Sequence, residues 1–284
     1  MTRIKGWLLD LYPDPNQGIV LWIITWEDDL RLAVRQFFPV TFYVAGDFAT
    51  LRKIWREIQH DPRVISLSRD QKQDVFIPTP VDVMAIRVQS PSDQANLFHM
   101  LLERYPNITY YDADLPIQVR HCAQFATFPL ALCDFIIDET NQLIDLQALN
   151  SRWDINPEMP PLRIMEIYPN TDPTKADPDS LLLSSDRFKR SLRLDDPSIY
   201  IRQLDELLRT YDPDILVTEW GDSWLIPFLL DQCKNTGLPL ALNRDSTREV
   251  RWQKETTYFS YGHIIYRPEE AHLFGRCQTT LKIR

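Results

Sequence analysis

Apolar residues at alternate positions predict several β-strands at the start of the chain. Two such segments, 4–12 and 19–26, flank a turn at 13–18 that contains Pro, Asn and Gly, which is typical of a β-hairpin. The segment 30–38 continues this sheet or forms a short helix. The chain is therefore expected to begin with strand-rich structure.

The stretch from residue 40 to residue 111 carries the clearest periodicity. Its signals follow the order strand, helix, strand, strand, helix, strand, over the ranges 40–45, 48–59, 64–69, 81–88, 91–105 and 107–111. The second helix opens at Pro91 and is expected to present Leu97 and Leu101 to the core. This order predicts a ferredoxin-like βαββαβ unit within a β-rich domain.

A domain boundary is expected near the middle of the chain. The segment 151–161 contains three prolines, and proline fixes φ and removes a hydrogen-bond donor from the backbone. We therefore assign residues 1–150 to a first domain and residues 151–284 to a second.

Strands and helices alternate in the second domain. Its predicted elements are strands at 162–168, 214–217, 258–266 and 271–276, helices at 198–210 and 224–233, and a short extended segment at 238–245. Ser198 is the expected N-cap of the first helix, and Pro227 fits the first turn of the second. This mixed-sheet α/β order is typical of a ribonuclease H-like core, so the whole chain is expected to be α+β.

Composition and charge narrow the classes of function. The 284 residues are 44% hydrophobic and 25% charged, which allows a sizeable core. A net charge of −9 argues against a protein that grips duplex DNA through a basic surface, because such binding depends on neutralising phosphates. The four cysteines do not cluster with histidines, which favours reduced thiols over a zinc site. Without a signal peptide or a long apolar run, we expect a cytoplasmic protein that does not contact a membrane.

Other candidate chemistry is sparse. His121 beside Cys122 lacks a nucleophile-elbow motif. The basic residues between Arg187 and Arg193 are offset by the flanking acids Asp186, Asp195 and Asp196 and indicate a solvated loop. Core packing explains five aromatic residues better than a stacking platform for single-stranded DNA would: Trp22, Trp26, Trp220, Trp224 and Tyr261. No set of nucleic-acid-binding residues can be assigned.

Several stretches resemble family B DNA polymerases. The most specific reads YDPDILV at 211–217 and LPLALNRD at 238–245, around a G-D-S-W-L turn and a helix. It is similar to that family's second exonuclease motif region. Shorter matches are Gly6–Asp10, Tyr110–Leu115 with FATFPL at 125–130, Pro161–Met165 and the pair Gly275-Arg276. The resemblance covers nearly the whole chain.

Active members of that family remove a mismatched 3′ end with two metal ions held by acidic side chains. Carboxylates suit this role because Mg²⁺ prefers oxygen ligands. At the aligned positions this chain has neutral residues: Tyr168, Asn170, Leu225 and Thr280. The resemblance therefore implies a degenerate, C-terminally incomplete exonuclease domain without metal or cofactor. Pro169 is expected to interrupt the hydrogen-bond ladder of the first strand.

A rearranged metal site is the alternative. Glu166 shares the predicted face of Tyr168, and Glu219 or Asp222 could join it, which would give an active Mg²⁺-dependent 3′–5′ exonuclease. In the other interpretation these three acids are solvated or capping residues. Asp222 is then expected to cap the helix that begins near Trp224.

The resemblance implies a catalytically inactive amino-terminal and exonuclease-like module with a structural or nucleic-acid-binding role in DNA replication or repair. Because palm and thumb sequences are not seen, the expected partner is a polymerase-like chain or domain. Single-stranded DNA or a primer–template is a further candidate. A pure protein-interaction module with no nucleic-acid role is the remaining rival. The sequence does not identify the partner or the oligomeric state.

Overall fold

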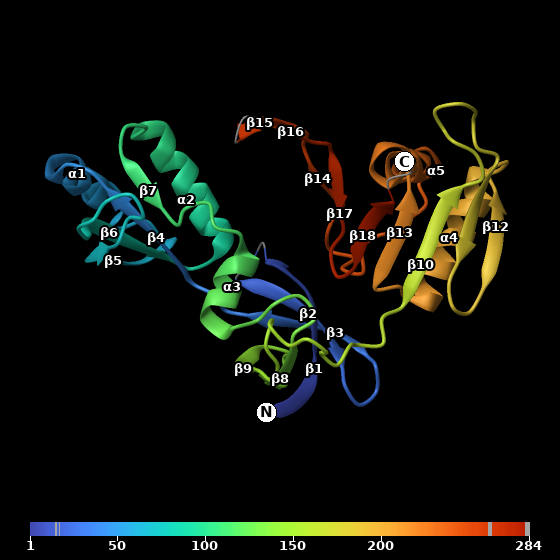
Figure 1. Ribbon diagram of the computed structural model, residues 1–284, viewed down its shortest axis with the longest axis horizontal. Coiled ribbons are helices and arrows are strands. Elements are labelled where there is room, and N and C mark those ends of the chain that lie inside the picture. Colours follow the sequence, from blue (N-terminus) through green and yellow to red (C-terminus); the bar gives the residue numbers. More distant parts are fainter. Residues whose placement is uncertain (15, 17, 261–262, 282–284) are drawn as a thin grey trace. The chain divides into compact units, whose positions relative to one another are not determined.

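The chain forms two compact units, Met1–Pro160 and Pro161–Arg284 (Figure 1). The computed structural model describes residues 1–14, 16, 18–260 and 263–281. The division falls later than the predicted boundary at residue 150. One reason is that Trp7 Nε1 donates a hydrogen bond to the Glu158 carbonyl oxygen at 3.0 Å, which holds the proline-rich segment to the first unit.

A five-stranded antiparallel sheet joins the two ends of the first unit. Its order is β3-β2-β1-β8-β9, from the strands β1 (Thr2–Pro13), β2 (Ile19–Thr25), β3 (Arg31–Gln36), β8 (Leu132–Ile137) and β9 (Leu143–Ala148). The predicted hairpin is confirmed as β1 and β2, and the segment 30–38 contains a strand, not a helix. Because β1 also pairs with β8, the start of the chain lies beside residues far along the sequence.

The stretch from residue 40 to residue 111 forms a four-stranded antiparallel sheet with order β5-β6-β4-β7. Its elements are β4 (Val40–Ala45), α1 (Phe48–Ile58), β5 (Val64–Lys72), β6 (Val81–Val88), α2 (Pro91–Arg104) and β7 (Thr109–Tyr111). Asp47 and Ser90 cap the two helices, since their side chains accept hydrogen bonds from the first turns. Ile54 and Leu97 of the helices pack with Phe42 of the sheet in one core.

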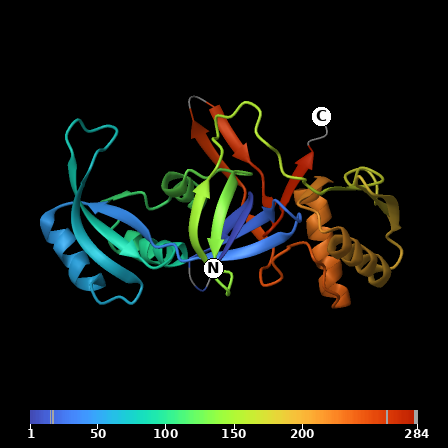
Figure 2. The ribbon, with the colours of Figure 1, turned by 90° about the horizontal axis from the view of Figure 1, so that it is seen from below.

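The second unit is built on a mixed sheet with order β12-β11-β10-β13-β18. Its strands are β10 (Ile164–Pro169), β11 (Ser180–Ser184), β12 (Lys189–Arg193), β13 (Ile215–Glu219) and β18 (Cys277–Leu281). β12, β11 and β10 are antiparallel neighbours, whereas β10, β13 and β18 run parallel. The helices α4 (Pro197–Tyr211) and α5 (Ile226–Thr236) lie side by side (Figure 2). They pack on one face of the sheet, where Met165 meets Leu204 and Leu229.

Smaller strands fill the segment between α5 and β18. β14 (Arg251–Gln253) pairs with β17 (Glu270–His272), and β15 (Thr256–Ser260) pairs with β16 (His263–Arg267). The predicted single strand at 258–266 was therefore wrong, because 258–260 belong to β15 and 263–266 to the antiparallel β16, while 261 and 262 lie outside the described residues. The predicted strand at 271–276 was too long, since β17 ends at His272.

Three further predictions for the second unit were wrong. Asp196, not Ser198, caps α4: its carboxylate accepts from the Ser198 backbone N–H at 2.8 Å. The basic segment expected to be a loop is the edge strand β12. The segment 238–245 forms no strand. β12 satisfies its backbone by pairing with β11, a neighbour that the local sequence does not show.

Pro169 does not interrupt the ladder as expected. It ends β10 opposite Leu181, and the backbone N–H of Asn170 donates to the Ser180 carbonyl oxygen at 3.0 Å. The pairing of β10 with β13 stops at Ile167, so the missing N–H of Pro169 removes no bond from that side. Taken together, the chain is a mixed α+β protein rich in strands. No helix of the described ranges is both long and apolar enough to cross a membrane.

A buried histidine lies in the core of the first unit. His121, on α3 (Ile117–Phe125), has no exposed surface. Its Nδ1 lies 2.6 Å from Thr127 Oγ1 and its Nε2 lies 3.1 Å from Gln36 Oε1. Both ring nitrogens thus have partners other than Cys122, which argues against a nucleophilic pair. Burial lowers the pKa of His121 to about 4.

We expect His121 to make folding depend on pH. The imidazole of His121 binds a proton near pH 6.5 in the unfolded chain but only near pH 4 in the folded chain. The free energy of unfolding therefore decreases as pH falls between these values. The loss amounts to about 3 kcal/mol at about 1.4 kcal/mol per pH unit. Urea unfolding from pH 7.5 to 4.5 should show this loss in the wild-type chain and not in His121→Gln. The exposed neighbour variant Gln124→Ala should keep the wild-type slope, and an unchanged slope in His121→Gln would contradict the assignment.

Candidate functional site

The first aligned motif lies at the end of β10. Tyr168 is half-buried and pairs with Leu182 of β11. Asn170 is exposed, and its Nδ2 donates to Asp179 Oδ1 at 2.8 Å. Its Oδ1 accepts from the backbone N–H groups of Asp179 and Ser180, each at 3.2 Å. Asn170 therefore closes the loop at 171–179, and neither aligned residue supplies a carboxylate.

The second aligned position is in the core. Leu225 is 1% exposed and ends the π-helical turn η1 (Gly221–Leu225). It belongs to the same apolar cluster as Met165 and Ile167 of β10. Burying an unpaired carboxylate among such neighbours would be costly, so leucine suits this site in the absence of a metal ion.

The third aligned position belongs to a polar network behind that turn. Thr280 Oγ1 donates to Asp222 Oδ2 at 2.6 Å, and Asp222 Oδ1 accepts from the Ala271 backbone N–H at 2.9 Å. The Gln278 amide lies between Thr280 Oγ1 at 2.7 Å and Thr218 Oγ1 at 2.9 Å, and its other end faces Asp222 Oδ1. The sequence led us to expect that Asp222 caps the helix near Trp224. That prediction was wrong, because Asp222 instead ties η1 to β18.

Gly221 is required at the first residue of η1. A Cβ built there would lie 2.0 Å from Thr218 Oγ1 and 2.7 Å from Thr280 Oγ1, far inside any contact distance. The backbone of the turn thus sits directly on the polar network. This close approach places Leu225 in the core, where the family places an acid.

The three acids of the alternative metal site are divided by the sheet. The strand register puts Glu166 and Glu219 on the face that α4 and α5 do not cover. Asp222 bonds Thr280, which lies on the helix-covered face. Glu166 Oε2 instead accepts from Ser184 Oγ at 2.5 Å. The carboxylates therefore do not converge on one point.

A two-metal centre does not fit the residues present. The aligned side chains offer a phenol, an amide, a hydroxyl and an aliphatic group, whereas Mg²⁺ prefers carboxylate oxygens. Within residues 1–14, 16, 18–260 and 263–281, no three His, Cys, Asp or Glu side chains gather closely enough to hold a metal ion.

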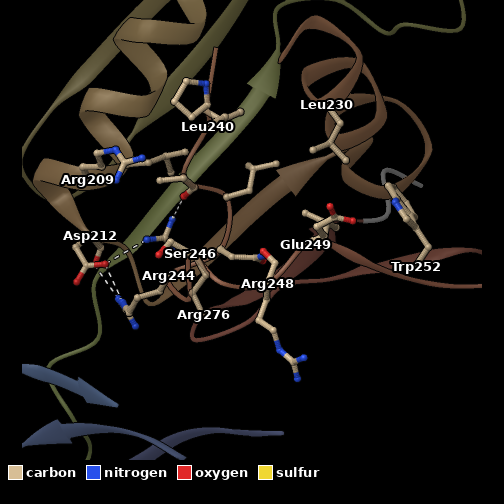
Figure 3. A pocket seen from close by; sticks show the side chains of 16 residues that line it. Arg209, Asp212, Leu230, Leu240, Arg244, Ser246, Arg248, Glu249, Trp252 and Arg276 are labelled. Atoms are coloured by element: carbon tan, nitrogen blue, oxygen red, sulfur yellow. Dashed lines mark hydrogen bonds and ion pairs between the residues drawn. The ribbon is translucent and has the colours of Figure 1, made fainter. Parts of the chain in front are cut away.

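The stretch most similar to the family builds an ion-pair cluster at the other end of the strands. Arg244 lies at its centre: Nε donates to Asp212 Oδ1 at 2.8 Å and Nη2 to Asp214 Oδ1 at 2.9 Å. Arg276 Nη2 adds a bond to Asp212 Oδ1 at 3.2 Å. Figure 3 shows both guanidinium groups turned to Asp212.

The same cluster fixes backbone from separate segments. Arg244 Nη1 donates to the Gly275 carbonyl oxygen at 2.6 Å, and Arg276 Nη1 to the Ala241 carbonyl oxygen at 2.9 Å. Asp214 is fully buried, and its Oδ2 accepts from the Arg163 backbone N–H at 2.9 Å. The cluster therefore joins the starts of β10, β13 and β18 to the segment after α5.

Charges of both signs meet in the cluster. The guanidinium groups of Arg163, Arg244 and Arg276 face the carboxylates of Asp212 and Asp214. Burial lowers the pKa of Arg276 to about 10, with further lowering by the charge of Arg244.

The aromatic residues considered as a stacking platform have other roles. Trp26 stacks on Trp7 with ring centroids 4.7 Å apart, and Trp224 stacks on Phe228 at 4.9 Å. Each of these rings thus has one face already covered by protein. Tyr261 lies outside the described residues.

Comparison with known proteins supports the resemblance. A DNA polymerase of Pyrococcus horikoshii is 21% identical over 229 residues, which are 78% of this chain and 17% of that protein. DNA polymerase 1 of Pyrococcus abyssi is 20% identical over 222 residues, or 75% of this chain and 27% of that protein. The structure of the family B DNA polymerase from Pyrobaculum calidifontis matches with a TM-score of 0.68 and 16% identity over 98% of this chain and 36% of that chain.

The resemblance to family B DNA polymerases is thus confirmed in fold. The matched part of the solved polymerase is its amino-terminal region. The chain spans less than a third of the curated relatives and about a third of the solved polymerase. No protein-family model matches it.

Breaking a buried ion pair of the cluster should cost more stability than breaking an exposed ion pair. Arg244→Gln removes the guanidinium group from the fully buried carboxylate of Asp214, and we expect it to lower the free energy of unfolding of the second unit by about 3–5 kcal/mol. Arg209→Gln breaks the exposed pair with Asp205 and should cost less than about 1 kcal/mol. Urea unfolding of both variants checks this difference. Equal, small effects would show that the cluster does not hold the second unit together.

Proposed function

We propose that this chain is a catalytically inactive amino-terminal and exonuclease-like module of a family B DNA polymerase, which serves a structural role in DNA replication or repair by docking on a polymerase-like chain or domain. The observation that carries the proposal is the presence of neutral side chains at every aligned metal-ligand position of an intact scaffold. Tyr168 and Asn170 end β10, Leu225 is in the core, and Thr280 bonds Asp222.

The strand orders support the two domain types in this proposal. The order β5-β6-β4-β7 with two helices on one face is that of a ferredoxin-like unit. The order β12-β11-β10-β13-β18, antiparallel on one side of β10 and parallel on the other, is that of a ribonuclease H-like core. We assign the first unit to the polymerase amino-terminal domain and the second to an exonuclease-like domain.

The uncovered face of the second sheet supports docking. The buried cluster of this unit places α4 and α5 on the other face. On the uncovered face Ile164 is 43% exposed, Leu182 is 37% exposed and Leu281 is 52% exposed. Exposed apolar residues gathered on one sheet face are typical of a protein–protein contact. A net charge of −9 makes DNA the weaker candidate for this surface.

The proposal predicts no exonuclease activity. Incubation with a 3′-labelled single strand and Mg²⁺ or Mn²⁺ should release no nucleotide, because two-metal cleavage needs converging carboxylates. The double variant Glu166→Gln, Glu219→Gln serves as the control for a contaminating nuclease, which would act equally in both samples. Release by the wild-type chain that this double substitution abolishes would overturn the proposal in favour of a rearranged metal site.

Docking predicts that a charge on the uncovered sheet face weakens the complex. Where a polymerase-like chain is encoded beside this one, that chain is the probe, and its association with this chain is followed by analytical ultracentrifugation. Leu182→Lys should weaken association at least about tenfold, because a buried unpaired charge is costly at an interface. Leu102 lies in the first unit and is 39% exposed, so the matched control Leu102→Lys should leave association unchanged. Association that Leu182→Lys does not alter would exclude this face as the docking surface.

A further inference from the structure

A groove of about 780 Å³ lies in the second unit between α4, α5 and the segment 239–252 (Figure 3). It adjoins the ion-pair cluster, which precedes β13. Tyr168 and Asn170 lie at the opposite end of the parallel strands. The groove is therefore separate from the degenerate exonuclease positions.

Arginine dominates the polar lining of the groove. Arg209, Arg244, Arg248 and Arg276 line it, against the acids Asp212 and Glu249. Arg276 is 3% exposed, and its Nε has no hydrogen-bond partner among the described residues. A ligand that brings an acceptor to this buried N–H forms a hydrogen bond that the free protein lacks, and this bond stabilises the complex. Together with the four arginines of the lining, this buried donor favours an anionic ligand.

Apolar side chains form another part of the lining. Leu208, Leu230, Leu240 and Val250 line the groove with the half-buried Trp252. Figure 3 shows Trp252 on the side of the groove away from Arg209 and Asp212. An indole beside aliphatic side chains offers a surface on which a planar base can stack. One end of the groove is thus suited to an anion and the other to a flat, apolar group.

We propose that this groove binds a nucleotide, with its phosphate toward Arg276 and its base against Trp252. Arginine suits the phosphate because its planar fork donates several hydrogen bonds in fixed geometry. Glu249 opposes the anion, but it is exposed at the rim, where solvent and salt weaken its field. A free mononucleotide and the phosphorylated end of a strand carry the same chemistry. The proposal does not depend on docking, and either can fail alone.

Calorimetry on the full chain at low salt tests the site. We expect dAMP to bind at least about tenfold more tightly than deoxyadenosine, which lacks the phosphate, and than inorganic phosphate, which lacks the base. A short 5′-phosphorylated oligonucleotide provides the second source. Tighter binding of dAMP indicates a free nucleotide, and tighter binding of the oligonucleotide indicates a strand end.

Rim variants place the ligand without disturbing the cluster. Ser246 is exposed and lines the groove, so Ser246→Asp should weaken dAMP about tenfold, while Glu249→Gln should tighten it about threefold. Ser198→Asp adds the same charge on exposed surface of α4 outside the groove and should change nothing. The proposal is overturned if dAMP does not bind, if phosphate alone binds equally well, or if Ser246→Asp has no effect.

Discussion

The second unit depends on the buried contact of Arg244 with Asp212 and Asp214. Helices and strands bury their apolar faces wherever they meet, but the starts of β10, β13 and β18 come from distant parts of the chain. A guanidinium group with donors in a fixed fork can hold two carboxylates and several carbonyl oxygens at once. Because Asp214 is fully buried, losing its partner would leave an uncompensated charge in the core. The cluster therefore fixes which ends of the strands meet.

This arrangement is consistent with the proposal that the chain keeps the most specific family pattern without metal ligands. Asp212 and Asp214 of YDPD and Arg244 of the later Arg-Asp pair are residues of the cluster, so we expect them to stabilise the fold. The aligned acids would lie at the other end of the strands, beyond Ile167 of β10 and Thr218 of β13. A sequence can thus lose the metal ligands at one end of the strands and retain the ion-pair cluster at the other. Similarity in this stretch therefore indicates the fold more securely than the activity.

Local patterns in the sequence predicted most elements, because alternation and helical spacing act over a few residues. The hairpin of β1 and β2, the helices α1 and α2, and Pro227 in the first turn of α5 were confirmed. Long-range contacts were not predictable. β12 was missed because basic residues on an edge strand look like a solvated loop. The role of Asp222 was missed because its partners, Ala271 and Thr280, lie far along the chain.

The neutral residues at the aligned positions are energetically consistent with one another. Carboxylates that converge on metal ions repel one another when the ions are absent, and burial makes that repulsion stronger. Leu225 packs in the same cluster as Met165, where an aspartate without a metal ion would be desolvated. The amide of Asn170 donates a hydrogen bond to Asp179, which a carboxylate at this position could not do. If metal binding is not needed, as we propose, a neutral residue such as Leu225 avoids the desolvation cost of a buried carboxylate. Neutral residues at these positions are therefore compatible with a stable scaffold.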